Sequence, residues 1–514
     1  MNATQEDTIR LLSDPATFGA GTDRVERIET HVSLVFLGRD RVFKLKRAVV
    51  FPYLDFSTSE KRRLACEAEI RINKRTAPSI YRGVVAISRK SDGALALGND
   101  GEVIDWVVEM NRFDQDTLFD RLATKGMLNR AMMEDLADAI ADFHNKAETH
   151  NETGAGGSTG IEMIIKSNAE CFGQSNSGIL EAKKTQTLTR LSIEALGNVA
   201  KLLDRRRDAG RVRLCHGDLH LRNIFLIDGK PALFDAIEFN TAFSTIDVLY
   251  DLAFVLMDLN YRGLERLFNI LFNRYFDISG EGGESLSGLR VLALFISMRA
   301  TIRAHVDMAQ AESLSDPELA NRRGGEAADY LSMALESLKS TTPVLIAVGG
   351  LSGSGKSRMA RELAPHLGGA RVVRSDSTRK RLAGVALSER LGPDGYTPEM
   401  TDRTFQALFD EVTWALKSGF PVIADAVFSA PAHRRAVADI AKAQGVPFTG
   451  LWLEAPPDVM ARRVKERKRN VSDADASVLK LQLDYELDEI DWFKIDSSGP
   501  CDETLAAGLE KISH

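Results

Sequence analysis

The chain of 514 residues has few cysteines and no long apolar run. Its four cysteines are scattered along the chain without a Cys-x-x-Cys pair, which disfavours a zinc site and a disulfide framework. Since no stretch of about 18 apolar residues occurs, no transmembrane helix is predicted. The first residues also lack the charged and then apolar pattern of a signal peptide. These absences indicate a protein of the reducing cytoplasm.

A strong charge of either sign is absent too. The formal net charge is −7, which argues against a dedicated nucleic-acid coat or a polybasic membrane binder. The composition, 44% hydrophobic and 27% charged, is that of a globular protein. Because one hydrophobic core rarely serves a chain of this length, we expect two or three domains.

Residues 1–340 are predicted to form a small strand-rich lobe and then a larger helical lobe. Apolar residues alternate on both sides of a turn at residues 38–40, which is a hairpin signature. A helix is expected next, with Leu64, Glu67 and Ile70 at helical spacing. Further strands follow, and helices then continue to the end of this segment.

After Pro343 the pattern changes. The stretch PVLIAVGG is continuously apolar, as a buried parallel strand should be, and helices and strands alternate after it. This alternation predicts an α/β three-layer fold with a parallel sheet. We therefore expect one domain at residues 1–340 and a second at residues 341–514.

The second domain opens with a phosphate-binding motif. The segment that runs through Gly350, Gly353 and Gly355 to Lys356 and Ser357 fits G-x-x-x-x-G-K-[ST], between an apolar strand and a helix. The glycines let backbone N–H groups close around phosphates, and the helix N-terminus adds its dipole. Lys356 is expected to reach the β- and γ-phosphates, and the Ser357 hydroxyl to bind Mg²⁺.

Three more side chains are expected beside this motif. Asp376 follows the second strand of the domain, where a carboxylate can accept the proton of an attacking hydroxyl, and Arg379 lies one helical turn later. Asp425 ends the third strand, in the position of a Walker-B-like, metal-binding acid or of an acceptor ligand. Without the motif beside them, Asp376 would be interpreted as the N-cap of a surface helix and Asp425 as a structural acid.

A basic stretch at residues 461–470 contains six basic residues and one glutamate. Such a charge run is usually a solvated helix face, but this one follows a strand and a turn, where small P-loop kinases have their lid. Arg463 and Arg467 are four residues apart and share one helix face. Arginines in a lid can neutralise charge on the transferring phosphoryl group.

Residues 341–514 resemble the small P-loop kinases near gluconate kinase, chloramphenicol phosphotransferase, zeta toxins and polynucleotide kinase. Asp376 and Arg379 look like the acceptor-activating D-x-x-R pair of polynucleotide kinases. The stretch RNVSDADASVLKLQ resembles a segment near the adenine pocket of predicted ATP-binding kinases. The resemblance implies a kinase reaction and leaves the acceptor open.

The first domain carries a second set of catalytic residue types. In HGDLHLRN, Asp218 and Asn223 have the spacing of the protein-kinase loop H-R-D-x-x-x-x-N. Asp218 is expected to orient the acceptor hydroxyl and take its proton, while Asn223 binds Mg²⁺. Asp235 ends the following strand, PALFD, where the second metal-binding acid belongs.

The segments HGDLHLRN, LFDAIEF and IDVLYDLAF, together with the Phe-His pair in ADFHNK, resemble the aminoglycoside phosphotransferase and choline kinase family. This resemblance implies an α+β, bilobal, protein-kinase-like fold. It also implies that Lys44 pairs with the α- and β-phosphates and that Glu69 binds this lysine. Lys46 lies on the same strand face and Glu67 lies close to Glu69, so these alternatives stay open.

By the same resemblance, WVVEM is the hinge, where the backbone of Glu109 and Met110 meets the adenine, and Asp251 braces the catalytic loop. Two features depart from the kinase pattern. No G-x-G-x-x-G loop lies between the first strands, so another turn, near Ser33, must cover the phosphates. The metal segment reads D-A-I-E, in which Glu238 either adds a ligand or faces solvent.

The pairing of the two domains resembles bacterial proteins described as bifunctional aminoglycoside phosphotransferase/ATP-binding proteins. We therefore expect a cytoplasmic kinase with two sites, both dependent on ATP and Mg²⁺, that phosphorylate hydroxyls of small polar molecules. Two alternatives remain open. The first domain could be a non-catalytic nucleotide-binding regulator, and the second could be a polynucleotide 5′-kinase or a zeta-toxin-like nucleotide-sugar kinase. Nucleic acid is disfavoured by the net charge, and no membrane partner is expected.

Overall fold

The computed structural model describes residues 3–51, 54–152, 156–175, 177–279, 288–339, 342–466, 471–473, 476–485 and 487–512. The chain divides into two compact units, which consist of Met1–Gly160 with Asp204–Val255 and of Ile161–Leu203 with Leu256–His514. The helices after Leu256 thus belong to the same compact unit as the C-terminal part of the chain. The sequence instead predicted a domain boundary at residue 340. None of the helices in the described ranges is both long and apolar enough to cross a membrane.

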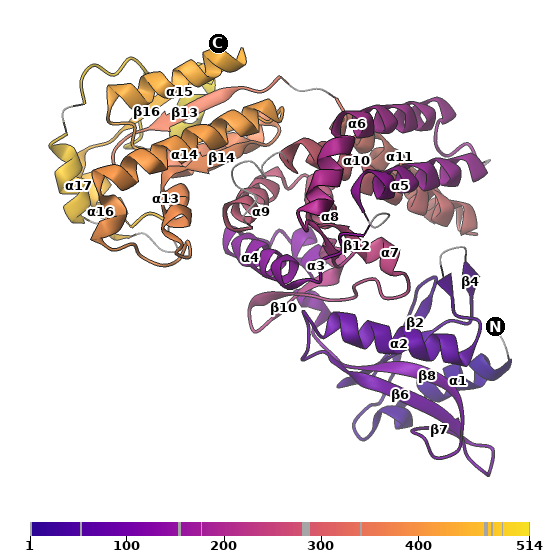
Figure 1. Ribbon diagram of the computed structural model, residues 1–514. Helices are drawn as coiled ribbons and strands as arrows, with labels where there is room; N and C mark the ends of the chain where they lie inside the picture. The colour runs from indigo at the N-terminus through magenta and orange to yellow at the C-terminus, as the bar shows by residue number, and fades with distance from the viewer. Residues whose placement is uncertain are drawn as a thin grey trace. The chain divides into compact units, whose positions relative to one another are not determined.

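The first unit begins with a six-stranded antiparallel sheet (Figure 1). In spatial order the strands are β1 (Glu26–Glu29), β2 (Ser33–Leu37), β3 (Arg41–Lys46), β8 (Glu102–Asn111), β6 (Tyr81–Arg89) and β7 (Leu95–Leu97). The expected hairpin is confirmed, since Leu37 of β2 pairs with Val42 of β3 across the turn. Phe36, Phe43 and Val107 are fully buried in the core of this sheet.

One helix of the first unit, α2 (Ser59–Asn73), packs on β6 and β8. The Thr58 side chain accepts a hydrogen bond from Lys61 N and so caps the helix start. The helix was predicted, but Leu64 and Glu67 are exposed, and the buried face carries other residues, Glu69 among them. The C-terminal half of α2 therefore directs the charged side chain of Glu69 into the core.

The rest of the first unit places short strands among helices. The remaining elements are α1 (Ala3–Ser13), β4 (Val50–Phe51), β5 (Leu54–Asp55), α3 (Phe119–Thr124), α4 (Arg130–Lys146), β9 (Val212–Leu214), β10 (Ile224–Ile227), β11 (Lys230–Leu233), α7 (Thr241–Ser244) and β12 (Thr245–Asp247). Strands β10 and β11 form a hairpin, and β9 pairs with β12. The segment between β9 and β10 contains the predicted catalytic loop.

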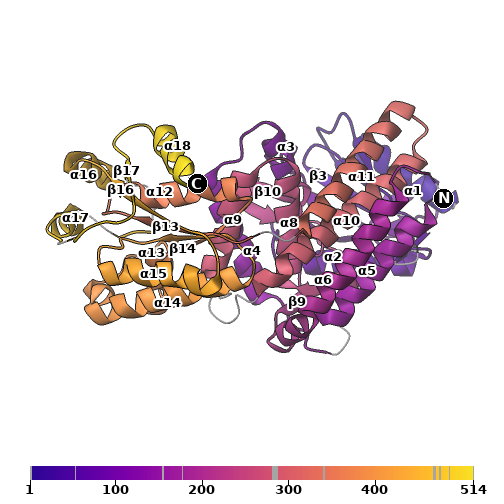
Figure 2. The ribbon, with the colours of Figure 1, turned by 90° about the horizontal axis from the view of Figure 1, so that it is seen from above.

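The helical part of the second unit is a bundle of long helices. Its members are α5 (Gly157–Gln174), α6 (Ala182–Asp208), α9 (Glu265–Ile278), α10 (Leu289–Ser313) and α11 (Pro317–Ser337). Helix α8 (Val248–Tyr261) begins in the first unit and ends in the second. In Figure 2, α5, α6, α10 and α11 run side by side. Tyr261 stacks on Tyr330 with 3.8 Å between the ring centroids.

The C-terminal part of the second unit is the predicted parallel α/β fold. Five strands lie in the order β14 (Arg371–Arg374), β15 (Val422–Asp425), β13 (Leu345–Gly349), β16 (Phe448–Glu454) and β17 (Phe493–Asp496). Figure 2 shows α12 (Lys356–Leu363) and α18 (Cys501–Ile512) on one face, with α14 (Pro398–Lys417) and α15 (Pro431–Gln444) on the other. The described residues of this part also form the helices α13 (Ser375–Ala383), α16 (Pro457–Lys465) and α17 (Ala476–Leu483). Strand β17 and helix α18 were not predicted.

A partly buried histidine of α10 makes the stability of the second unit dependent on pH. His305 Nε2 lies 3.2 Å from Asn168 Oδ1, and burial, aided by Arg303, lowers the pKa of His305 to about 4. An unfolded chain protonates histidine near pH 6.5, so the unfolded state binds more protons than the folded state between about pH 6.5 and 4. The stability that His305 contributes is therefore complete above about pH 6.5 and is lost as the pH falls through this window.

We predict that His305→Gln removes up to about 3 kcal/mol of this acid-induced loss, because a neutral amide takes up no proton. Thermal unfolding of both proteins between pH 7.5 and pH 4 measures the effect, with the exposed His31→Gln as the control. An equal loss of stability in wild type and His305→Gln would contradict the prediction.

Candidate active sites

The loop between β9 and β10 brings Asp218 and Asn223 together. Asn223 Nδ2 donates to the backbone oxygen of Asp218 at 2.8 Å and to its Oδ2 at 2.9 Å. The Asp218 side chain is 38% exposed, and His220 Nε2 lies 3.3 Å from Asp218 Oδ2. The carboxylate is thus oriented by two neighbours and remains accessible to a substrate hydroxyl.

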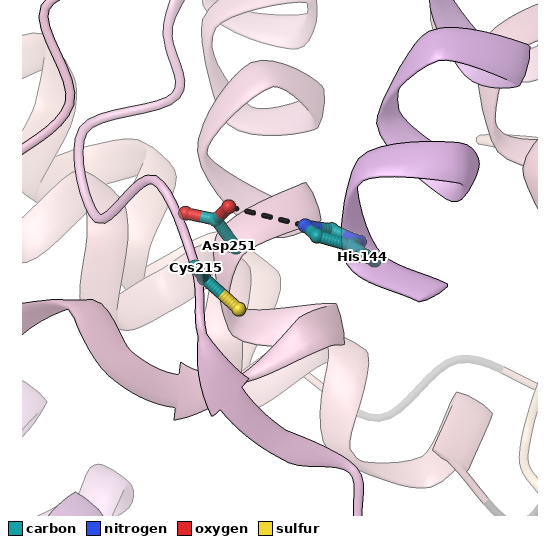
Figure 3. Close-up of side chains that lie close together, drawn as sticks. All are labelled: His144, Cys215 and Asp251. Atoms are coloured by element: carbon teal, nitrogen blue, oxygen red, sulfur yellow. Dashed lines mark hydrogen bonds and ion pairs between the residues drawn. The ribbon is translucent and has the colours of Figure 1, made fainter. Parts of the chain in front are cut away.

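A fully buried aspartate forms hydrogen bonds with the backbone of this loop. Asp251, in the first turn of α8, accepts hydrogen bonds from His216 N at 3.1 Å and Gly217 N at 2.8 Å. His144 Nε2, at the end of α4, lies 3.1 Å from Asp251 Oδ2 (Figure 3). These contacts confirm that Asp251 braces the catalytic loop.

His144, Cys215 and Asp251 lie close enough to be considered as metal ligands, with their ligand atoms within 4.8 Å of one another (Figure 3). However, both oxygens of Asp251 already accept backbone hydrogen bonds, and Cys215 Sγ contacts Ile246 O at 3.5 Å. Burial and the nearby Asp251 raise the pKa of the Cys215 thiol well above its usual value. Because metals bind the thiolate, a protonated and buried thiol is a poor ligand. We interpret the cluster as structural.

The lysine-glutamate pair expected at the nucleotide is present in the first unit. Lys44 Nζ lies 2.9 Å from Glu69 Oε1 and 2.5 Å from Asp235 Oδ1. Burial alone would lower the pKa of Lys44, but the carboxylates outweigh burial and raise it well above its usual value. Glu67 instead pairs with Arg63 at the surface of α2, so the geometry favours Glu69.

A second lysine shares Glu69, a feature that the sequence left open. Lys46 is 1% exposed, and its Nζ contacts both Glu69 and Glu238. Burial acts to raise the pKa of Glu69, yet the two lysines bring it below its ordinary range. Glu238, in the D-A-I-E segment, is also buried and does not face solvent. Lys44 therefore pairs with Glu69 and Asp235, whereas Lys46 pairs with Glu69 and the buried Glu238.

Asp235 follows β11 beside the catalytic loop. Its backbone has φ 61°, an uncommon conformation for a residue other than glycine, and its N–H donates to the Tyr81 hydroxyl at 3.2 Å. Phe234 N donates to Asn223 O at 3.0 Å, which places Asp235 next to Asn223. Since Asn223 directs its amide nitrogen at Asp218, its amide oxygen is the atom available to a cation. Carboxylate and amide oxygens are donors that Mg²⁺ prefers, so these residues fit a Mg²⁺ site.

The structure places Glu109 and Met110, the residues expected at the hinge, near the end of β8. Both residues lie inside β8 and pair with β3 on one side and β6 on the other. Neighbouring strands therefore flank this segment on both sides, with a register shift in β6 between Tyr81 and Gly83. The contact of this backbone with an adenine stays a prediction. The Glu109 side chain contacts Arg41 at 2.9 Å.

The turn predicted to cover the phosphates lies between β1 and β2. Thr30 Oγ1 accepts from Ser33 N at 2.9 Å, and Thr30 N donates to Ser33 O. These bonds close a tight turn that contains no glycine. The Ser33 hydroxyl is buried and has no hydrogen-bond partner among the described residues.

In the second unit, the phosphate-binding motif connects β13 to α12, as predicted. Gly353 has φ 88°, and a Cβ at this position would lie 2.5 Å from Met460 O. A Cβ at Gly350 would lie 2.6 Å from Leu453 O. These glycines are thus required by close backbone approach as well as by conformation. Lys356, the first residue of α12, is 8% exposed.

The carboxyl ends of the parallel strands bring the other predicted residues to the same edge. Asp425 pairs in register with Val348 of β13 and with Arg374 of β14. It is 3% exposed, and Arg374 Nε lies 3.2 Å from its Oδ2. Although burial lowers the pKa of Arg374, Asp425 and Asp376 outweigh this effect and raise it. With Ser357 at the start of α12, Asp425 offers the hard oxygen donors that suit Mg²⁺.

Arg379 binds the connector between α13 and α14 rather than projecting into solvent. Its Nη1 donates to Gly395 O at 2.8 Å, and its guanidinium lies 5.1 Å from the centroid of the Tyr396 ring. The same connector contacts Asp473, whose Oδ2 accepts from the Tyr396 hydroxyl at 3.1 Å, while Lys380 Nζ lies 2.9 Å from Asp473 Oδ1. No role for Tyr396 or Lys380 was predicted, because their contacts with Asp473 join segments far apart in the chain.

The basic stretch is described only in part. Arg463 lies in α16, and its Nη2 donates to Ser497 O at 2.7 Å. A Cβ at Gly355 would lie 3.9 Å from Arg463 Nη1, so this guanidinium is adjacent to the phosphate-binding loop. Arg467, the second predicted lid arginine, lies outside the described residues.

Both parts of the chain match families of known proteins. Residues 67–289 match the model of the Phosphotransferase enzyme family, and residues 345–486 match a model described as an AAA domain. An uncharacterized protein of Mycobacterium tuberculosis (strain ATCC 25618 / H37Rv) is 29% identical over 482 residues, which are 93% of each chain. An adenylyl-sulfate kinase of Myxococcus xanthus is 33% identical over 120 residues, 23% of this chain and 60% of that protein.

Two solved structures are also similar. A choline/ethanolamine kinase family protein from Mesorhizobium loti shares 13% identity and a TM-score of 0.38, covering 65% of this chain and 99% of its own. A gluconokinase from Sinorhizobium meliloti 1021 shares 22% identity and a TM-score of 0.25, covering 34% of this chain and 93% of its own. The family matches show that the chain combines a phosphotransferase-family domain with a P-loop domain, both of kinase type. They confirm the resemblance and the fold class inferred from the sequence.

We predict that Gly353→Ala abolishes nucleotide binding at the P-loop, since the new Cβ would overlap Met460 O. Gly368→Ala is the matched control, because Gly368 also has a positive φ, 70°, but its Cβ would meet no atom within 4 Å. The measurement is the binding of ATP to chains that already carry Lys44→Met, which removes the predicted phosphate lysine of the other site. Equal ATP affinity in both glycine variants would refute the prediction.

Proposed function

We propose that the protein is a bifunctional ATP-dependent kinase, in which each domain transfers the γ-phosphate to a hydroxyl of a small polar molecule. The observation that supports the proposal is that each domain contains a candidate acid, a candidate phosphate-binding lysine and candidate hard oxygen donors. These groups are Asp218, Lys44 and Asp235 in the first domain, and Asp376, Lys356 and Asp425 in the second.

In the first domain, Asp218 orients the acceptor hydroxyl and receives its proton as the oxygen attacks phosphorus. Asn223 holds this residue in place through one hydrogen bond to its carboxylate and one to its backbone oxygen. Lys44 binds the α- and β-phosphates, and its present contact with Asp235 is replaced in part by contacts with the nucleotide. Glu69 keeps the Lys44 ammonium in position throughout.

In the second domain, the backbone of the phosphate-binding loop and Lys356 bind the β- and γ-phosphates. Asp376 accepts the acceptor proton, and Arg463, beside Gly355, stabilises charge on the phosphoryl group. Bound Mg²⁺, held by Asn223 and Asp235 in one site and by Ser357 and Asp425 in the other, would offset phosphate charge. Positioning and charge neutralisation suffice for this chemistry.

A small acceptor is favoured for the second domain over a nucleic-acid strand. Arg379, on which the resemblance to polynucleotide kinases rests, is 9% exposed and already bonds Gly395 O. Single-strand binding needs a positive groove with aromatic stacking platforms, whereas the net charge of this chain is −7. A sugar-sized acceptor needs only the acid and a few donors.

The test is transfer of label from γ-labelled ATP to a polar metabolite extract by the full chain. We predict that Asp218→Asn and Lys356→Met each remove a different labelled product, with a rate loss of about 100-fold or more, as expected for loss of a general base or a phosphate-binding lysine. Asp100→Asn, at an exposed position, is the control and leaves both products unchanged.

Other outcomes point elsewhere. Unchanged labelling in both variants would contradict the proposal. If Asp218→Asn removes no product but alters the rate of the Lys356-dependent one, the first domain is a regulator. A 5′-hydroxyl oligonucleotide is included at low and physiological salt, because strand binding weakens steeply with salt. Asp376-dependent labelling of this strand would replace the small acceptor by a polynucleotide.

A further inference from the structure

Strand β14 is an edge of the parallel sheet, and its outer side is bonded by a helix that precedes residue 340. Ala370 N donates to Asn269 Oδ1 at 3.1 Å, and Val372 N donates to Asn273 Oδ1 at 2.7 Å. Asn273 Nδ2 in turn donates to Ala370 O at 3.0 Å. On the inner side of β14, Arg371 N donates to Pro421 O. Because successive N–H groups of a strand point to opposite sides, those of Ala370 and Val372 point outward, to α9. The two asparagines, one helical turn apart, thus replace a missing strand.

A buried charge network joins the same two elements. Arg371 is 1% exposed, and its Nη2 lies 2.6 Å from both Asp277 Oδ1 and Glu411 Oε1. Arg381 Nη2 lies 2.6 Å from Glu411 Oε2, so two guanidiniums balance two carboxylates. Burial acts to raise the pKa of Glu411, but the arginines outweigh it and lower that pKa. A buried charge that loses its partner is strongly unfavourable, which makes this contact hard to separate.

Apolar contacts surround the polar ones. Phe272 of α9 stacks on Phe420, which precedes β15, with 5.9 Å between ring centroids. At the helix start, Arg266 forms a two-bond ion pair with Glu362 at the end of α12, at 2.7 and 2.8 Å. Helix α9 therefore contacts β14, the approach to β15 and the helix that follows the phosphate-binding loop.

The position of β14 matters because the strand ends at Arg374, two residues before Asp376. We propose that α9 is a structural part of the P-loop site and that Asp277, Asn269 and Asn273 position β14 and, through it, the acceptor-activating Asp376. The C-terminal catalytic unit then begins before α9 rather than at residue 341. The inference rests on the proposed function of Asp376, but its structural half can be tested without any acceptor.

The first test is amide hydrogen exchange on the full chain. In wild type, the Ala370 and Val372 amides should exchange about 100-fold or more slowly than an unprotected amide, although they lie on the outer side of an edge strand. In Asp277→Asn, amides of β14 should exchange about tenfold faster. Glu265→Gln, an equivalent charge removal at an exposed position of α9, should change nothing. Unprotected Ala370 and Val372 amides, or equal effects of the two variants, would overturn the inference.

The second test is the rate of the Lys356-dependent reaction. Asp277→Asn should lower kcat about tenfold and leave the KM for ATP unchanged, because ATP binds at β13 and α12 while the variant displaces Asp376. An equal rise in the KM for ATP would mean general loosening and would overturn the positioning role. If Lys356→Met loses no activity that wild type has, the proposed function of the P-loop site is refuted. The exchange experiment would still decide the role of α9.

Discussion

Glu69 lies fully buried between Lys44 and Lys46, and the geometry of the first site depends on how this charge is paired. A buried carboxylate needs partners, and each lysine needs a further anion because one carboxylate cannot neutralise both. Asp235 and Glu238 meet that need from the segment after the catalytic loop. Pairing of buried charges therefore holds strand β3, helix α2 and the D-A-I-E segment in fixed positions relative to one another.

The same constraint shapes the second site with other residue types. Arg374 pairs with Asp425 at the carboxyl edge of the sheet, and Arg371 pairs with Asp277 and Glu411 at the opposite end of the same strand. Strand β14 is thus held by charge at both ends. Because arginine stays charged when buried, it suits a position where a phosphate chemistry site must keep its shape before substrate arrives.

The sequence predicted the parts of both sites that lie within short segments. The phosphate-binding loop, the Asp218–Asn223 pair and the alternation of strands and helices follow local patterns, and the structure has them where expected. Lys44 and Glu69 could be chosen only by family resemblance, since spacing alone did not separate them from Lys46 and Glu67. An apolar segment does not reveal which strands flank it, so the position of Glu109 and Met110 between β3 and β6 could not be predicted, and the hinge stays a prediction. Contacts such as Asp277 with Arg371 have no local signal, since they join residues almost a hundred positions apart.

The central claim is that one chain holds two nucleotide sites of different architecture. Calorimetric titration of the full chain with a non-hydrolysable ATP analogue and Mg²⁺ tests this claim most directly, because it counts sites without needing an acceptor. The account predicts two sites per chain in wild type, and one in each of the variants Lys44→Met and Lys356→Met. A stoichiometry of one in wild type, abolished by Lys356→Met and unaffected by Lys44→Met, would contradict it.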